Sequence, residues 1–264
     1  MKLFAAMVLT LVALTANAQD WAKEKMKDSP RHQEWVDLKS GDRTVKAFVV
    51  YPERKDKAPV IVLIHEIMGL TDWAMLMADQ LAAAGAIVIA PDFVSGLGPN
   101  GGRTKDFEDV GKVREAISGL KPEQVTSDLN AACDYGLKIP AGNGTVSVGG
   151  FCWGGTQTFR FATNRADLRA AFVFYGSGPT DAEAIKRINC PVYGFYGGND
   201  NRINATIPDS EKLMKDAGKT YQPVIYDGAG HGFMRAGDMP DASVDNKKGR
   251  EEGFKRLVGL ISKG

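Results

Sequence analysis

The segment that most constrains this chain is GTVSVGGFCWGG, residues 144–155. Its first part, Thr145 to Val148, is short and β-branched apart from one Ser, as expected for a buried strand. Glycines follow, and the run TQTFRFATN beyond them has the polar–apolar pattern of a helix. Cys152 therefore stands in a G-x-C-x-G turn between a strand and a helix. This is the pattern of a nucleophile elbow, with Cys at the position that more commonly holds Ser.

The composition of the turn follows from what an elbow requires. Residues next to the nucleophile must be small, because the helix would otherwise collide with the preceding strand, and glycine lacks the Cβ that would clash. The helix N-terminus would also direct free N–H groups toward the sulfur of Cys152, which favours thiolate over thiol. The alternative is a buried, inert cysteine in a glycine-rich turn. The order of strand, turn and helix favours the nucleophile.

Strand-like and helix-like segments alternate along the rest of the chain. Two alternating runs flank residues 40–42 (SGD) and predict an antiparallel hairpin. Later apolar runs, such as VIVLI at residues 60–64, are typical of parallel strands covered on both faces. Thr71 and Gly85 mark the start and the end of the helix that follows. The chain is therefore predicted to be an α/β protein with a mostly parallel sheet, an antiparallel N-terminal hairpin and helices on both faces.

Two segments lack a clear pattern. Residues 19–30 are polar and charged, and predict a lead-in without regular structure. Residues 94–124 form a long irregular region with a weak helix signal at 107–117, before a helix that begins at about Val125. GLGPNG at residues 96–101 matches G-x-G-x-x-G, but it contains Pro and does not open a helix, which argues against a dinucleotide site. We expect a mobile active-site loop there instead.

The N-terminus has the pattern of a secretory signal peptide. Lys2 precedes an apolar run that ends in Ala16-Asn17-Ala18, and this run is shorter than the roughly 20 residues needed to cross a bilayer. We expect cleavage after Ala18, export to the periplasm or medium, and no membrane anchor afterwards, because no Cys follows that would carry a lipid. The alternative is a buried N-terminal helix. Residues 19–264 then form one domain, a size that suits a single α/β core.

Charge and cysteine content exclude several classes of protein. The chain has 33 Lys and Arg against 32 Asp and Glu, which gives no case for binding nucleic acid or an anionic membrane surface. The spacing of Cys133, Cys152 and Cys190 fits no zinc pattern. A bridge between Cys133 and Cys190 is left open, although two buried thiols are favoured. We predict no metal and no cofactor, and a monomer is the simplest expectation.

The candidate catalytic residues follow the predicted strands. In a parallel sheet, functional residues lie on loops that leave the carboxyl ends of strands. Cys152, Asp200 and His231 each follow a strand, in the order nucleophile, acid, base that α/β-hydrolases use. Cys152 would attack a carbonyl carbon, His231 would take the thiol proton, and Asp200 would hold the imidazole. Asp200 alone is typical of a turn or cap and His231 alone of a surface loop, but together they predict a triad.

Four motifs support a family assignment: HEIMG at 65–69, GFCWGG at 150–155, YGGND at 196–200 and GHGFMR at 230–235. With them the chain resembles the dienelactone hydrolase (carboxymethylenebutenolidase-like) family of the α/β-hydrolases, over roughly residues 34–263. The resemblance implies that Glu66 helps to deprotonate the thiol and that the backbone N–H groups of Ile67 and Trp153 form the oxyanion hole. It also implies that Arg235 binds a substrate carboxylate, although from the residues alone Arg235 is equally a solvated cation.

The chain departs from the family pattern in three places. Residues 94–124 do not align, so a second substrate-binding arginine is left open, with Arg103 and Arg114 as candidates. Trp153 is bulky beside the nucleophile, and export is unusual for an intracellular catabolic pathway. His65 is expected to have a structural role.

These observations predict a cofactor-free hydrolase of a small ester or lactone that works through a thioester acyl-enzyme. The alternatives are an exported general carboxylesterase or thioesterase of the same fold and, less favoured, a non-catalytic binding protein. A redox role is weaker still, since no second cysteine lies near Cys152 in the sequence.

Overall fold

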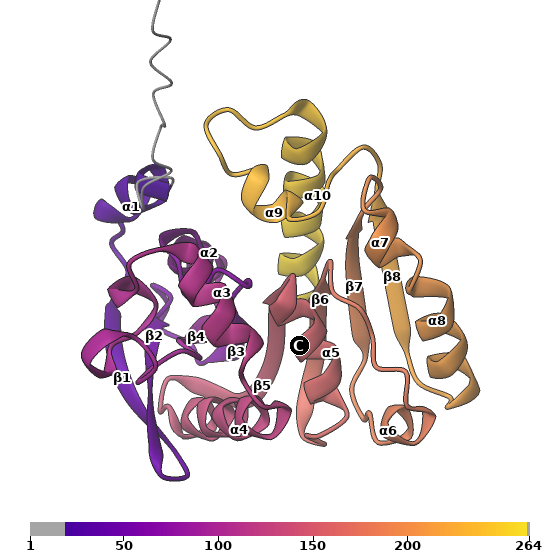
Figure 1. The fold of residues 1–264 in the computed structure, drawn as a ribbon, viewed down its shortest axis with the longest axis horizontal. Helices are drawn as coiled ribbons and strands as arrows, with labels where there is room; N and C mark the ends of the chain where they lie inside the picture. The colour runs from indigo at the N-terminus through magenta and orange to yellow at the C-terminus, as the bar shows by residue number, and fades with distance from the viewer. Residues whose placement is uncertain (1–18, 263–264) are drawn as a thin grey trace, which may run out of the picture.

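The computed structural model describes residues 19–262, so the predicted signal peptide at residues 1–18 lies outside the described part. Eight strands form one sheet: β1 (Gln33–Ser40), β2 (Arg43–Val50), β3 (Ala58–Ile64), β4 (Ile87–Pro91), β5 (Gly142–Phe151), β6 (Leu168–Phe174), β7 (Val192–Gly197) and β8 (Tyr221–Tyr226). Their order is β1-β2-β4-β3-β5-β6-β7-β8 (Figure 1). The pairs β1–β2 and β2–β4 are antiparallel and all others are parallel. The predicted α/β fold with an antiparallel N-terminal hairpin is confirmed.

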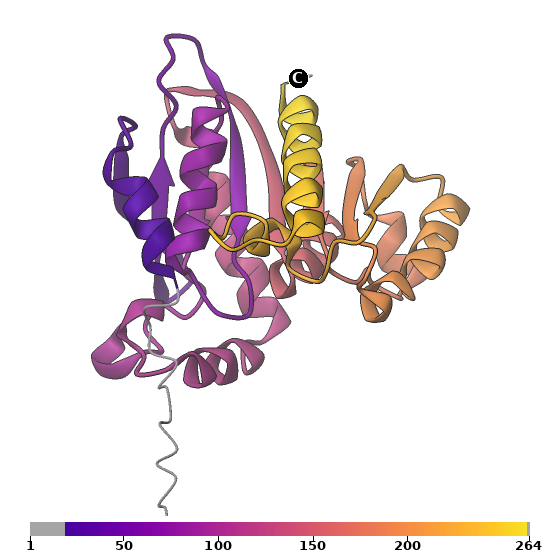
Figure 2. The same cartoon turned by 90° about the horizontal axis from the view of Figure 1, so that it is seen from above.

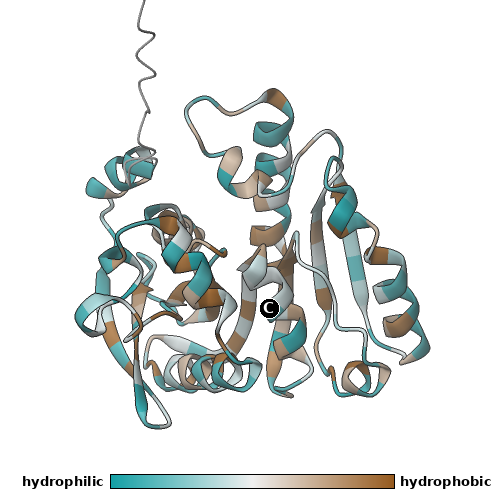
Figure 3. Cartoon of the chain, in the orientation of Figure 1, coloured by the Kyte–Doolittle hydropathy of each residue, from teal (hydrophilic) through white to brown (hydrophobic). Residues whose placement is uncertain are grey.

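Helices cover both faces of the sheet (Figure 2). One face packs against α1 (Asp20–Lys27), α2 (Asp72–Ala83), α9 (Phe233–Ala236) and α10 (Val244–Ile261). The other packs against α4 (Pro122–Lys138), α5 (Trp153–Ala162), α6 (Ala182–Lys186) and α8 (Ile207–Asp216). Apolar residues are concentrated on the central strands, whereas the outer helices carry hydrophilic residues (Figure 3). Burial on both faces explains why the central strands read as continuous apolar runs in the sequence.

The helix predicted after β3 has the expected ends. The Thr71 hydroxyl accepts a hydrogen bond from the Ala74 N–H at 3.4 Å, and α2 begins at the next residue. Gly85 follows the C-terminus with φ of +100°, a conformation that a residue with a Cβ rarely adopts. Both predicted signals are confirmed.

The expectation of an irregular lead-in at residues 19–30 is wrong, because the segment contains α1. Ala22 on this helix is completely buried among residues of α2 and the sheet. The Gln19 side-chain oxygen accepts a hydrogen bond from the Trp73 N–H at 2.9 Å. A helix of 8 residues is too short to be stable alone, so these tertiary contacts hold it, and the local sequence gives little sign of them.

The region at residues 94–124 is more ordered than the sequence suggests. It contains two turns of 3₁₀ helix, η2 (Pro99–Gly101) and η3 (Thr104–Asp106), and then α3 (Val110–Ser118). The Asp109 carboxylate caps α3 by accepting from the Lys112 N–H at 3.0 Å. The next helix, α4, begins at Pro122 rather than at Val125, since Pro suits the first position of a helix.

Cys133 and Cys190 are both free, buried thiols, as favoured from the sequence. Burial raises the pKa of the Cys133 thiol to about 12 and that of Cys190 to about 11. Neither is therefore a reactive thiolate near neutral pH. None of the helices within residues 19–262 is both long and apolar enough to span a bilayer.

A glycine substitution at the elbow, with a second one on α10 as its control, tests the packing of the elbow. A Cβ at Gly155 would lie 2.3 Å from the carbonyl oxygen of Phe174, so we expect Gly155→Ala to lower the free energy of unfolding by about 3 kcal/mol. A Cβ at Gly259 on α10 meets no atom within 4 Å, so Gly259→Ala should raise that free energy by about 0.5 kcal/mol. Urea unfolding followed by circular dichroism measures both values. Equal free energies of unfolding for the two variants would contradict the close contact of Gly155 with the carbonyl group of Phe174.

Candidate active site

Cys152 lies at a sharp corner between β5 and α5. Its backbone has φ of 55° and ψ of −114°, a conformation that costs energy for a residue with a side chain. The Cys152 N–H donates to the carbonyl oxygen of Phe174 at 3.0 Å, and its own carbonyl accepts from the Thr156 N–H at 3.1 Å. These bonds to β6 and α5 hold the strained corner in place.

The glycines around Cys152 are required by close backbone contacts. A Cβ at Gly150 would lie 2.4 Å from the carbonyl oxygen of Gly154. A Cβ at Gly154 would lie 2.4 Å from the carbonyl oxygen of Ile64, at the end of β3. The first turn of α5 therefore rests directly on the carboxyl end of β3. This contact brings the loop after β3 beside the corner that carries Cys152.

The structure brings the three residues of the predicted triad together. His231 follows β8, and its Nε2 lies 3.2 Å from the Sγ of Cys152. Its Nδ1 lies 2.5 Å from the Oδ2 of Asp200, which follows β7. Asp200 is only 6% exposed. This is the geometry in which one nitrogen exchanges a proton with the nucleophile while a carboxylate orients the other.

Asp200 also acts as a helix cap. Its Oδ1 accepts a hydrogen bond from the Ile203 N–H at 3.5 Å, at the start of the short helix α7 (Asn201–Asn204). The cap and the contact with His231 use different oxygens of one carboxylate. The capping role and the catalytic role considered for this residue are thus compatible.

The surroundings of His231 favour its protonated form. The hydrogen bond with Cys152 is the main cause that raises the pKa of His231, burial opposes it, and Asp200 raises it further, to about 9. The surroundings of His231 therefore favour an imidazolium next to the sulfur of Cys152.

Glu66 is a buried residue at the same edge of the sheet and forms an ion pair with the half-buried Arg235. Its Oε2 accepts from the Arg235 Nε at 2.8 Å, and its Oε1 accepts from the Tyr175 hydroxyl at 3.3 Å. Its carboxylate has no hydrogen bond to Cys152 among the described residues. The side chains of Glu66 and Arg235 are therefore neighbours of the triad that stabilise each other.

Tyr175 is a site residue that sequence reasoning did not identify. It is fully buried, has φ of 40°, and its ring packs edge-on against His231 with the centroids 5.1 Å apart. Burial raises the pKa of its hydroxyl well above the usual value, so the group stays protonated and donates to Glu66. Its position directly after β6 is the signal that would have indicated it.

His65 is enclosed by structure. Its Nδ1 lies 2.7 Å from the carbonyl oxygen of Glu66, and its Nε2 accepts from the Phe93 N–H at 3.4 Å. Burial lowers the pKa of His65, which keeps the ring neutral. The Trp153 indole stacks on this ring with the centroids 5.6 Å apart. These contacts support the structural role expected for His65.

Ile67 and Trp153 share one apolar cluster with α3. Both pack against the cluster that Val94, Val113 and Ile117 form. The Trp153 N–H is the first in α5, so it has no hydrogen-bond partner within the helix. The indole of Trp153 thus joins the elbow to the region of residues 94–124.

The candidates for a second substrate-binding arginine are placed as follows. Arg103 lies over the ring of Trp35, with its guanidinium carbon 3.4 Å from the ring centroid. Arg114 is exposed on α3. In the described part of the chain, neither has a hydrogen bond to a triad residue.

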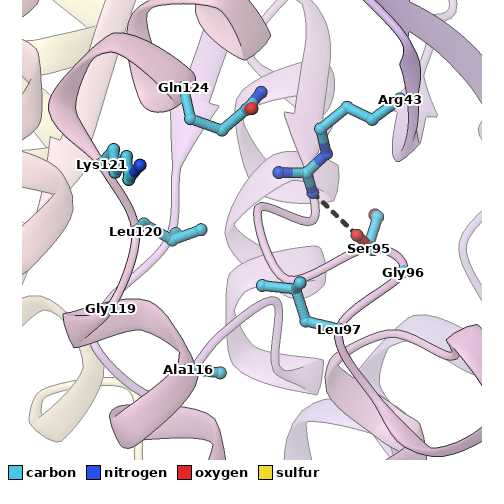
Figure 4. A pocket seen from close by; sticks show the side chains of 9 residues that line it. All are labelled: Arg43, Ser95, Gly96, Leu97, Ala116, Gly119, Leu120, Lys121 and Gln124. Carbon is cyan, nitrogen blue, oxygen red and sulfur yellow. Dashed lines mark hydrogen bonds between the residues drawn. The ribbon is translucent and has the colours of Figure 1, made fainter.

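A cavity of about 540 Å³ lies apart from the triad, between the start of the loop at residues 95–97 and the connection from α3 to α4 (Figure 4). The residues that line it are Arg43, Ser95, Gly96, Leu97, Ala116, Gly119, Leu120, Lys121 and Gln124. Arg43 donates hydrogen bonds to the carbonyl oxygens of Phe93 and Ser95, at 3.0 and 2.8 Å. This arginine therefore fixes the start of the loop. Within residues 19–262, no group of three or more His, Cys, Asp or Glu side chains is arranged to hold a metal ion.

The model of the dienelactone hydrolase family matches residues 45–263. The chain belongs to the dienelactone hydrolase family. It is therefore a hydrolase of that family, as the sequence motifs predicted.

This dienelactone hydrolase family member is similar to proteins that are named as carboxymethylenebutenolidases or as a lactonase. It is 29% identical over 233 residues to a provisionally named carboxymethylenebutenolidase of Methylorubrum extorquens, covering 84% of this chain and 78% of the relative. A Salmonella typhimurium protein with the same provisional name is 29% identical over 200 residues, with 71% and 72% covered. A Bradyrhizobium protein, provisionally named 2-oxo-3-(5-oxofuran-2-ylidene)propanoate lactonase, is 27% identical, with 76% and 83% covered.

Solved structures of the family have the same fold. A provisionally named dienelactone hydrolase from Klebsiella pneumoniae superposes with a TM-score of 0.77 at 22% identity, covering 89% of this chain and 99% of that one. A dienelactone hydrolase-like promiscuous phosphotriesterase from metagenomic libraries gives a TM-score of 0.75 at 22% identity, with 88% and 98% covered. At this identity the likeness concerns the fold alone.

The raised pKa of His231 predicts how stability depends on pH. Because this pKa is higher in the folded protein than its unfolded value of about 6.5, the stabilisation is fully present below about pH 6.5 and is lost as the pH rises through about 9. The difference in free energy of unfolding between the wild type and His231→Gln should therefore shrink as the pH increases over this range. Denaturant unfolding at a series of pH values measures it. A difference that grows with pH would contradict the assigned contacts.

Proposed function

We propose that this dienelactone hydrolase family member cleaves a small ester or lactone with Cys152 as nucleophile, His231 as base and Asp200 as the group that orients the imidazole. The observation that carries the proposal is the continuous contact from Sγ to imidazole to carboxylate, over 3.2 Å and 2.5 Å. A cysteine that serves only for packing does not require a strained corner, a hydrogen-bonded imidazole and a buried carboxylate together.

The reaction follows in two steps. The Cys152 thiolate attacks the carbonyl carbon, a C–S bond forms, the C–O bond breaks, and the His231 imidazolium gives its proton to the leaving oxygen. A thioester acyl-enzyme results. Water then attacks the thioester carbon, His231 takes a proton from that water, and the C–S bond breaks to release the carboxylic acid and restore the starting pair.

The backbone N–H groups of Ile67 and Trp153 are proposed to stabilise the oxyanion that forms in both steps. Two observations support this assignment. The Trp153 N–H is unused within α5, and the close contact of Gly154 with Ile64 places the loop after β3 beside the elbow.

Glu66 is proposed to help to deprotonate the Cys152 thiol, as in the family. Arg235 is proposed to bind a substrate carboxylate. Their ion pair at 2.8 Å keeps the guanidinium charge next to the triad. Burial works against the charge of Arg235, but Glu66 outweighs it and raises the pKa of the guanidinium. The named substrate of the Bradyrhizobium lactonase is a lactone that carries a carboxylate, which favours an anionic lactone for this chain as well.

The second candidate keeps the site and changes the substrate, to that of a general carboxylesterase or thioesterase. The bulky Trp153 and the region at residues 94–124 favour it, because both border the loop proposed to carry an oxyanion donor. We further propose that the signal-like pattern at residues 1–18 directs export to the periplasm or medium. A non-catalytic binding protein is less favoured, since it needs none of the contacts made by Cys152.

The nucleophile is tested by substitution. We expect Cys152→Ala to lower kcat on aryl esters and lactones at least about a thousandfold, because no other group then forms the acyl-enzyme. The matched control is Cys190→Ala, which removes a buried thiol outside the site and should keep kcat within about twofold.

The thioester itself is detectable by mass spectrometry. Rapid quenching during turnover should show the acyl group on the peptide that contains Cys152, and not on those with Cys133 or Cys190. Full activity of Cys152→Ala, or acylation of another residue, would refute the assignment.

Arg235 is tested by comparing charged and neutral substrates. Replacing it with Ala removes a positive charge near the thiol, so the loss in kcat/KM should be at least about tenfold greater for a carboxylate-bearing lactone than for its methyl ester. Removal of the partner of Glu66 should also cause a smaller loss that both substrates share. Arg202→Ala, which changes an exposed arginine on α7, is the control. Equal losses on the two substrates would show that Arg235 does not bind the carboxylate.

A further inference from the structure

Thr104, on η3, joins two segments that lie far apart in the sequence. Its hydroxyl accepts a hydrogen bond from the Leu70 N–H at 3.0 Å and donates one to the Oδ1 of Asp92 at 2.8 Å. Its own N–H donates to the Oδ2 of Asp92 at 3.0 Å. Asp92, just beyond β4, is completely buried. One side chain thus connects the loop after β3 with the end of the neighbouring strand.

The loop has little room to shift away from Thr104. Gly69 has φ of +82°, and a Cβ there would lie 2.4 Å from the Thr104 hydroxyl oxygen. The Gly69 N–H donates to the carbonyl oxygen of Glu66 at 3.1 Å, which closes a tight turn over residues 66–69. A displacement of Leu70 or Gly69 would therefore move the whole turn, including Ile67.

The same loop is held from its other end. The His65 ring accepts from the Phe93 N–H, the residue next to Asp92, at 3.4 Å. Asp92 also accepts from the Val94 N–H at 3.3 Å, so three N–H or O–H donors from two residues converge on its carboxylate. Both ends of the loop at residues 65–70 are consequently tied to residues 92 and 93.

We propose that Thr104 and Asp92 are positioning residues that set the distance of the Ile67 N–H from the thiol, and so tune stabilisation of the oxyanion. This inference rests on the proposed function. Thr104 acts through the backbone of the loop and not on the substrate, and Asp92 acts by fixing the rotamer of Thr104. The region at residues 94–124 thereby contributes to the chemistry as well as to the shape of the proposed site.

The experiment distinguishes an effect on the loop that carries Ile67 from an effect on Cys152 and His231. Thr104→Val keeps the shape and removes the hydroxyl, so we expect kcat on an aryl ester to fall about tenfold or more, while KM changes little. The rate at which iodoacetamide alkylates Cys152, and its pH profile, should be unchanged, because alkylation needs the thiolate and His231 but no oxyanion hole. Thr104→Ser restores the hydroxyl and should restore most of kcat.

Thr158→Val is the matched control. Thr158 is completely buried, whereas Thr104 is half-buried, and the Thr158 hydroxyl has no hydrogen-bond partner among the described residues, so kcat should stay within about twofold of the wild type. If Thr104→Val does not fold, Thr104→Ala carries the same comparison with Thr104→Ser.

The outcomes decide the proposal. An unchanged kcat in Thr104→Val, equal losses of kcat and alkylation rate, or no recovery in Thr104→Ser would each overturn it. Failure of the proposed function is seen separately, as activity that survives in Cys152→Ala.

Discussion

The contact of the first turn of α5 with the ends of β3 and β6 is the constraint on which the site depends. Glycine at positions 154 and 155 allows backbone to meet backbone where any side chain would collide. That approach forces Cys152 into its strained conformation and exposes the first N–H groups of α5 beside the sulfur. The same approach puts the loop after β3 next to the thiol. The positions of the proposed nucleophile and of the proposed oxyanion donors are therefore consequences of one packing contact.

Two buried carboxylates at this edge of the sheet each face a partly exposed nitrogen base or cation. Asp200 faces His231 and Glu66 faces Arg235, and each carboxylate uses its second oxygen for another bond, to the Ile203 N–H and to the Tyr175 hydroxyl respectively. A buried carboxylate without such partners would be costly, and removal of one partner exposes that cost. Tyr175 packs on His231 and bonds to Glu66, so it links the two pairs. The proposed triad and the proposed carboxylate-binding arginine are thus in contact through Tyr175.

The sequence predicted the parts of the structure that depend on local pattern. The hairpin, the central strands, the caps of α2 and the strand-end positions of Cys152, Asp200 and His231 follow from periodicity, from turn residues and from the rule that parallel strands present their carboxyl ends together. The sequence did not predict α1, because its burial against α2 is a long-range contact. It also did not predict the Tyr175 link or the Thr104–Asp92 bonds. Those depend on which side chains meet across the sheet, and no local spacing encodes that.

The region at residues 94–124 connects these observations to specificity. It contacts the candidate site at two points: Trp153 and Ile67 pack against the cluster that contains Val113 and Ile117, and Thr104 bonds to the loop that carries Ile67. The corner at Cys152 can keep its chemistry while this region varies, because the corner is held by β3, β5, β6 and α5. A change in the region would move the surroundings of Trp153 and the proposed oxyanion loop together. Substrate choice and rate are therefore expected to vary jointly in this protein, with the bulky Trp153 as the residue that couples them.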